Sequence, residues 1–126
     1  MLTGAWGGLY SYPGRLPPVF FSATLVSHGA GFSGRAEEEA VAASGRRFAA
    51  GASLAGTLAG AAVGFTKTYD GRGGWRHAVL YRGRLSGDGT EIEGTWTIPD
   101  AWTGRFLMVR GTRAEEAEMR RAFERA

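Results

Sequence analysis

Apolar side chains in this chain of 126 residues recur mainly at every second position, which is the period of a β-strand with one buried face. In residues 91–98, for example, isoleucine, glycine and tryptophan alternate strictly with glutamate and threonine. The same pattern, interrupted by turns that contain glycine or proline, predicts eight strands. They lie at about residues 2–12, 19–27, 32–42, 48–58, 61–69, 75–85, 91–98 and 103–111.

The segments between the predicted strands are short, and residues 70–74 (DGRGG) form the clearest turn. Strands joined in this way pair as antiparallel hairpins, and closing the series into a barrel leaves no exposed edge. We therefore expect an all-β fold, an eight-stranded antiparallel up-and-down β-barrel. Residues 1–126 then form a single barrel domain, with strands over about 2–111 and a short C-terminal α-helix over about 113–125.

Two segments carry helical signals. Thr112 and Glu115 have the spacing of a capping box, and the apolar side chains that follow share one stripe of a short helix. This stripe consists of Met119, Ala122, Phe123 and Ala126, and we expect it to dock on the outside of the barrel. Residues 37–43 (EEEAVAA) also have high helix propensity, so a helix competes with the predicted strand there.

Residues 48–66 contain no charged side chain and have glycine at positions 56, 60 and 64, so a membrane-spanning helix is an alternative to two strands. Most of these residues are alanine and glycine, and strands are predicted on both sides, which favours the barrel. The first residues lack the basic and apolar regions of a signal peptide. We therefore expect a cytoplasmic protein that does not bind membranes.

Composition adds two constraints. The chain has no cysteine, which excludes disulfides, thiolate nucleophiles and zinc–thiolate sites. It has 21 glycines, several of them in predicted turns, whereas Gly4, Gly8, Gly83 and Gly94 lie within strands on the predicted inner face. Each inner glycine removes side-chain volume, so either a cavity remains or a neighbouring aromatic ring fills the space.

The net charge of +3 does not by itself indicate nucleic-acid binding, because proteins of that class concentrate basic residues on one face. The densest basic stretch contains Arg72, Arg76, Arg82 and Arg84, with an aspartate at either edge. We interpret this stretch as part of a solvated outer face and expect no nucleic-acid partner.

The first predicted strand contains Gly4-Ala5-Trp6, and Arg110 lies late in the last strand. A G-x-W on the first of eight antiparallel strands, together with a late arginine, resembles the calycin superfamily, which includes lipocalins and avidins. The resemblance implies structural roles: Trp6 would pack at one end of the barrel, and Arg110 would lie over its ring in a cation–π contact. The chain departs from typical lipocalins in its short length and lack of cysteine. No histidine follows His77 to replace the haem ligand of nitrobindin-like proteins, so no subfamily is assigned.

Residues that share the face of Trp6 and Arg110 should point into the barrel, and eight strands leave room for one small ligand at most. The candidate ligand-binding residues are Lys67, Tyr69, Tyr81, His77, Phe65, Trp96, Tyr10 and Tyr12. A lysine inside an apolar barrel is costly unless it is paired, and the run Glu37-Glu38-Glu39 has no inward partner that we expect. We predict that Lys67 binds a carboxylate or carbonyl oxygen of the ligand. The alternative is that it lies at the rim and extends to water.

No set of nucleophile, base and orienting group is apparent, and neither a phosphate-binding loop nor a metal-ligand spacing occurs. His77 is better explained as a satisfied histidine than as a metal ligand, since no carboxylate is predicted beside it. We predict a barrel that binds a small, mostly hydrophobic molecule in its interior, rather than an enzyme, and that uses no cofactor. Two alternatives stay open: an isomerase- or cyclase-type enzyme with the same cavity, and a structural module with a filled barrel that forms homo-oligomers.

Overall fold

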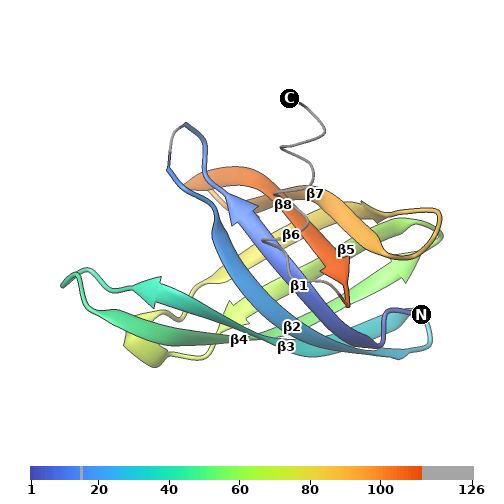
Figure 1. Ribbon diagram of the computed structural model, residues 1–126, viewed down its shortest axis with the longest axis horizontal. Coiled ribbons are helices and arrows are strands. Elements are labelled where there is room, and N and C mark those ends of the chain that lie inside the picture. Colours follow the sequence, from blue (N-terminus) through green and yellow to red (C-terminus); the bar gives the residue numbers. More distant parts are fainter. Residues whose placement is uncertain (15, 112–126) are drawn as a thin grey trace.

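The computed structural model describes residues 1–14 and 16–111, which form one closed barrel of antiparallel strands in simple sequence order (Figure 1). The strands are β1 (Gly4–Ser11), β2 (Val19–His28), β3 (Gly31–Val41), β4 (Arg47–Ala59), β5 (Ala62–Tyr69), β6 (Ala78–Leu85), β7 (Glu91–Ile98) and β8 (Trp102–Arg110). A short 3-10 helix, η1 (Arg72–Gly74), lies between β5 and β6. Strand β8 pairs with β1 and closes the sheet. The predicted all-β up-and-down barrel is confirmed, and the predicted C-terminal helix lies outside the described residues.

The main difference from the predicted strands is at β6, which begins at Ala78 rather than at residue 75. The chain first completes a turn, in which the amide of Trp75 donates to the carbonyl of Arg72 and the amide of Gly71 donates to the carbonyl of Trp75. Trp75 therefore precedes the sheet and projects from a loop, although it has the parity of a strand residue.

The helical alternatives for two segments are wrong. Residues 37–41 lie in β3, where pairing with β2 and β4 overrides their helix propensity. Residues 48–66 lie in β4, β5 and the turn between them. Across the described part of the chain, no helix has the length and apolar character needed to cross a membrane.

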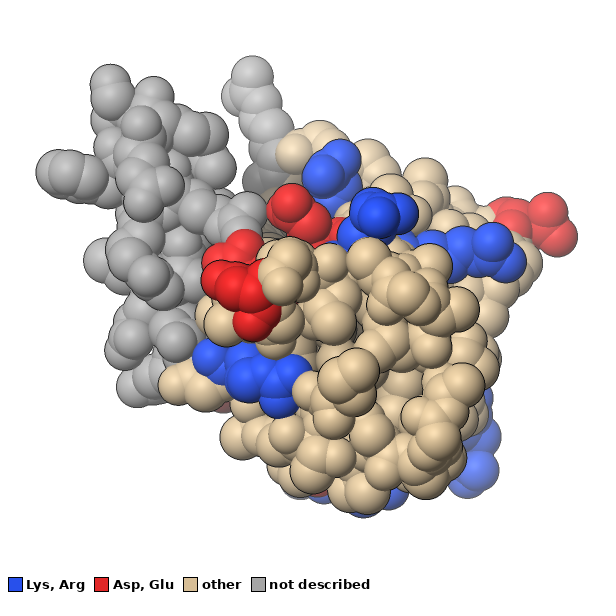
Figure 2. All heavy atoms as spheres, turned by 90° about the vertical axis from the view of Figure 1, so that its right-hand side faces the viewer, with Lys and Arg blue, Asp and Glu red and all other residues tan. Residues whose placement is uncertain are grey.

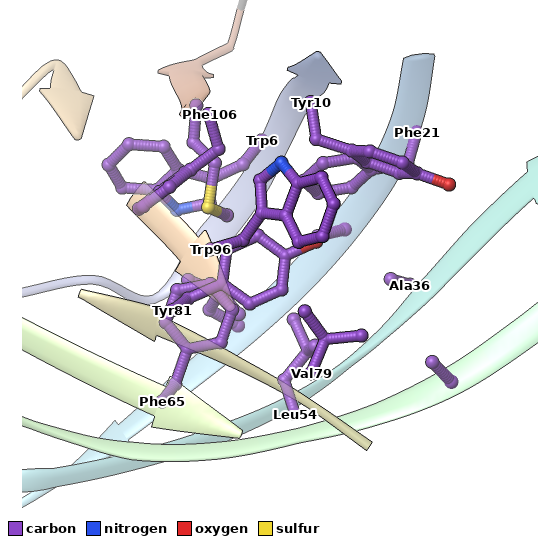
Figure 3. Packing of buried hydrophobic residues seen from close by; sticks show 14 of the residues in the cluster. Trp6, Tyr10, Phe21, Ala36, Leu54, Phe65, Val79, Tyr81, Trp96 and Phe106 are labelled. Carbon is purple, nitrogen blue, oxygen red and sulfur yellow. The ribbon is translucent and has the colours of Figure 1, made fainter. Parts of the chain in front are cut away.

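Aromatic side chains from several strands pack against one another in the interior (Figure 3). Phe65 stacks on Tyr81 with ring centroids 4.6 Å apart, and Phe106 meets Tyr81 edge-on at 4.9 Å. An inner glycine makes room for such a ring: a Cβ atom on Gly8 would lie 2.1 Å from Cζ of Phe21. At this position a neighbouring ring fills the space, so the glycine does not leave a cavity.

Trp6 packs at one end of the barrel. Its indole Nε1 donates to the carbonyl oxygen of Leu2 at 2.9 Å. The guanidinium carbon of Arg110 lies 4.5 Å from the centroid of the Trp6 ring, and the same guanidinium donates to the carbonyls of Gly89 and Thr3 at 3.0 Å. These contacts tie the N-terminal segment, β1 and β8 together where the barrel closes.

The outer surface carries charges of both signs. In the view of Figure 2, basic and acidic side chains are interspersed around a largely uncharged surface. Arg72, from the basic stretch noted above, contacts Glu37 at 3.0 Å and Asp70 at 3.1 Å. A small apolar cluster of Leu9, Leu107 and Val109, with Phe20 against it, is separate from the interior core.

Candidate functional site

A cavity of about 220 Å³ opens at the end of the barrel opposite Trp6, and we call it the mouth cavity. Its lining is mostly aromatic and includes all four tyrosines of the chain and three of its four tryptophans. The lining residues are Tyr10, Tyr12, Tyr69, Trp75, His77, Val79, Tyr81, Trp96, Ile98 and Trp102. Six of the eight predicted ligand-binding residues are therefore brought together, whereas Phe65 and Lys67 lie outside the lining.

Strand register places these rings against one another. Tyr81 on β6 is the register partner of Trp96 on β7 and of Phe65 on β5. At the end of β1, Tyr10 and Tyr12 both meet the Trp96 ring edge-on, at centroid distances of 6.0 and 5.4 Å. The walls of the mouth cavity are thus fixed by sheet pairing.

The segment between η1 and β6 adds Trp75 and His77 to the rim; His77 is a predicted site residue, whereas Trp75 is not among the predicted ones. This segment places Trp75 edge-on to Tyr69 at 5.0 Å and edge-on to Phe48 at 5.4 Å. His77 lies with its ring 4.7 Å from that of Tyr69. Burial lowers the pKa of His77 below its usual value of 6.5, so the ring is neutral at neutral pH. Trp102, at the start of β8, is also not among the predicted site residues. The signal that could identify it is its pairing with Ile98, which lies on the same face of β7 as Trp96.

A buried ion pair lies beside the mouth cavity. Nζ of Lys67 donates to Oε1 of Glu38 at 2.7 Å, and both side chains are only 1% exposed. The hydroxyl of Tyr10 donates to Oε2 of Glu38 at 2.5 Å, and the hydroxyl of Tyr69 donates to Oε1 at 3.0 Å. The carboxylate thus accepts three hydrogen bonds, two of them from residues that line the cavity.

This arrangement corrects two expectations. The expectation that no glutamate of the acidic run has an inward partner is wrong, because Glu38 is buried on the inner face of β3 while Glu37 and Glu39 are exposed. The rim alternative for Lys67 is also wrong, because its ammonium lies deep in the barrel, 4.4 Å from the centroid of the Phe21 ring. The period of two in β3 was the signal that identifies Glu38, since three consecutive residues of a strand cannot all face outward.

Burial and the nearby carboxylate keep the tyrosines protonated. Burial and the charge of Glu38 raise the pKa of Tyr10 and of Tyr69 far above the usual value of 10. Burial lowers the pKa of Lys67, and the charge of Glu38 acts in the opposite direction. At neutral pH the phenol protons therefore stay on the tyrosines and point at the carboxylate.

A second, larger hollow of about 910 Å³ lies over β1–β4 and extends to Gly111. Its lining combines Glu37, Glu39 and Arg47, which are exposed on the outside of the sheet, with residues that include the buried Trp6, Phe21 and Glu38. The described lining of the mouth cavity contains no aspartate, glutamate, lysine or arginine and gathers half-buried and buried polar groups among aromatic rings, which is the usual character of a small-molecule site. Within residues 1–14 and 16–111, no cluster of three histidine, aspartate or glutamate side chains is placed to hold a metal ion.

The chain matches no protein-family model, no curated protein and no solved structure.

Proposed function

We propose that this protein binds a small, mostly hydrophobic molecule in the mouth cavity. The observation that carries the proposal is the aromatic lining of the mouth cavity, which leaves about 220 Å³ of space beside the packed rings of Phe65, Tyr81 and Phe106. At about 30 Å³ per molecule, the cavity volume corresponds to roughly seven waters, and an engineered apolar cavity of about 150 Å³ takes up benzene. A single-ring molecule with one or two small substituents fits this volume.

The predicted residues contribute to the proposed site at two depths. Tyr12, Trp96 and Tyr81 supply aromatic walls that a flat ligand contacts directly. Phe65 acts through Tyr81, on which it stacks. Lys67 acts through Glu38, because the ion pair fixes the carboxylate that orients the hydroxyls lining the cavity.

Binding is favoured over the isomerase- or cyclase-type alternative by the state of the tyrosines. General acid–base catalysis is most effective when the pKa of the catalytic group lies near the working pH. Burial and Glu38 move the pKa of Tyr10 and Tyr69 in the other direction, away from neutrality. A filled structural barrel accounts for the packing around Trp6 but not for the open aromatic mouth.

We also infer a calycin-like, lipocalin-type architecture for the chain. Two observations support this inference: the closed meander of eight antiparallel strands and the stacking of Arg110 on Trp6. Barrels of this size have an interior just wide enough to be filled by side chains or to hold one small ligand, which agrees with a site restricted to the mouth.

The test blocks the cavity from one wall. Val79 is 5% exposed and lines the mouth, so Val79→Phe fills the cavity with a ring. Val26→Phe is the matched control, because Val26 is 51% exposed on β2. Ligand-observed NMR with a set of single-ring compounds should detect binding to the wild type and to Val26→Phe, with affinity lowered at least about tenfold in Val79→Phe. Equal binding by both variants, or no binding by the wild type, contradicts the proposal.

A further inference from the structure

Tyr10 and Tyr69 each use their single hydroxyl proton on Glu38. The two hydrogen bonds reach different oxygens of the carboxylate, Oε2 and Oε1. A phenol hydroxyl has one proton to donate and two lone pairs that accept. Once the proton is directed at Glu38, the hydroxyl oxygen can offer only acceptor positions to a ligand.

Lys67 also contacts the carboxylate of Glu38 and so helps to hold it in place as the acceptor of these hydrogen bonds. The ammonium of Lys67 donates to Oε1 of Glu38 at 2.7 Å, so the carboxylate is the acceptor for all three side chains, and a carboxylate oxygen that accepts from an ammonium pairs with donors around it. A hydroxyl that donates to a carboxylate also becomes a stronger acceptor, because hydrogen bonds in a chain polarise one another. The indole N–H of Trp96 is also engaged, since it donates to the carbonyl of Ser11 at 3.0 Å.

We propose that the mouth cavity selects single-ring ligands whose polar end donates a hydrogen bond, an aromatic O–H or N–H, and rejects aromatic carboxylates. This inference rests on the proposed function. A carboxylate ligand would direct its lone pairs at the oxygens of Tyr10 and Tyr69, and Glu38 already occupies the ammonium of Lys67. Tyr12, Tyr81 and the neutral His77 can each donate as well as accept, so the preference is set by Tyr10 and Tyr69, whose protons are directed at Glu38.

Three probes of similar size test the preference by calorimetric titration at neutral pH. Phenol donates and accepts hydrogen bonds, anisole only accepts, and benzoate is an anion that only accepts. We expect phenol to bind at least about tenfold more tightly than anisole or benzoate. Equal affinity for phenol and anisole overturns the inference and leaves the proposed function standing. Tightest binding of benzoate also overturns it, whereas no binding of any probe overturns the proposed function itself.

A double variant tests the cause. Glu38→Leu combined with Lys67→Met removes both charges, and replacing a buried ion pair by apolar residues of similar volume is often tolerated. The hydroxyl protons of Tyr10 and Tyr69 are then free to point into the cavity, so anisole should gain affinity and the preference for phenol should shrink at least about threefold. An unchanged ratio between the two probes contradicts the role of Glu38. Tyr10→Phe, which retains the charge pair, provides a second measurement and should weaken phenol without weakening anisole.

Discussion

The ion pair between Glu38 and Lys67 yields the sharpest prediction for stability. Both side chains are 1% exposed, so removal of either partner leaves a charge that water does not reach. Breaking a buried pair in this way costs about 3–5 kcal/mol, out of a total of about 5–15 kcal/mol for a domain. We expect each single variant, Glu38→Leu and Lys67→Met, to be strongly destabilised.

The two single variants should not be equal. Lys67→Met leaves Glu38 with two hydroxyl donors, from Tyr10 and Tyr69. Glu38→Leu removes the one hydrogen-bond acceptor that the described residues provide for Nζ of Lys67. We therefore place Glu38→Leu near the upper end of the 3–5 kcal/mol range, about 1 kcal/mol beyond Lys67→Met.

Urea unfolding followed by tryptophan fluorescence measures these effects. With a slope of about 2 kcal/mol per molar urea, a loss of about 4 kcal/mol lowers the midpoint by about 2 M. The double variant should lie within about 2 kcal/mol of the wild type, because no unpaired charge remains. Additive losses in the double variant would refute the reasoning, since they would mean that the two side chains stabilise the fold independently.

Three further predictions follow from the packing and the titrating groups. The folded state raises the pKa of Tyr10, Tyr69 and Tyr81 above the usual value of 10, so in alkali only the unfolded state releases these three protons. The free energy of unfolding should therefore fall by up to about 4 kcal/mol per pH unit above pH 10, which urea midpoints measure. The lowered pKa of Lys67 makes stability rise with pH, but only below the usual lysine pKa of 10.5, above which Lys67 has lost its proton in both states. Gly8→Ala should cost about 1–3 kcal/mol because its Cβ meets the ring of Phe21, whereas Gly87→Ala, with open space around it, should be near neutral in the same assay. Arg110→Lys should lower the thermal midpoint by several degrees, because an ammonium cannot both stack on Trp6 as a planar group and donate to separate carbonyls; an unchanged midpoint would contradict this role.

Strand periodicity predicts much of this fold, because one physical rule governs it. In a barrel every strand has a wet face and a dry face, so alternation identifies the strands and the inward side chains together. This is why Tyr10, Tyr69 and Trp96 could be placed in the interior from sequence. Trp75 escapes the rule, because it projects from the loop after η1 and not from a strand.

Glu38 shows a different limit of sequence reasoning. A run of three glutamates suggests a solvated surface by composition, and a helix by propensity. Strand parity places its middle member inside, but the energetic cost of that position is offset only by Lys67, which follows 29 residues later in sequence. The pairing depends on the register of β3 against its neighbours, which alternation within one segment does not supply.

The outcome at the inner glycines also depends on packing that sequence does not specify. Gly8 lies under the Phe21 ring, whereas space remains where Tyr12, Trp75 and Trp102 form the rim. A glycine looks identical in the sequence in both cases, because the rotamer of a neighbouring side chain decides whether the space is filled.

The central claim is that the mouth cavity takes a small ring with a donating polar end. A crystal structure of the protein grown with phenol tests it most directly. The account predicts the phenol ring between Tyr10, Tyr69 and Trp96, with its hydroxyl within hydrogen-bond distance of a tyrosine oxygen. Phenol seated only in the outer hollow over β1–β4, with the mouth cavity free of it, would contradict the account.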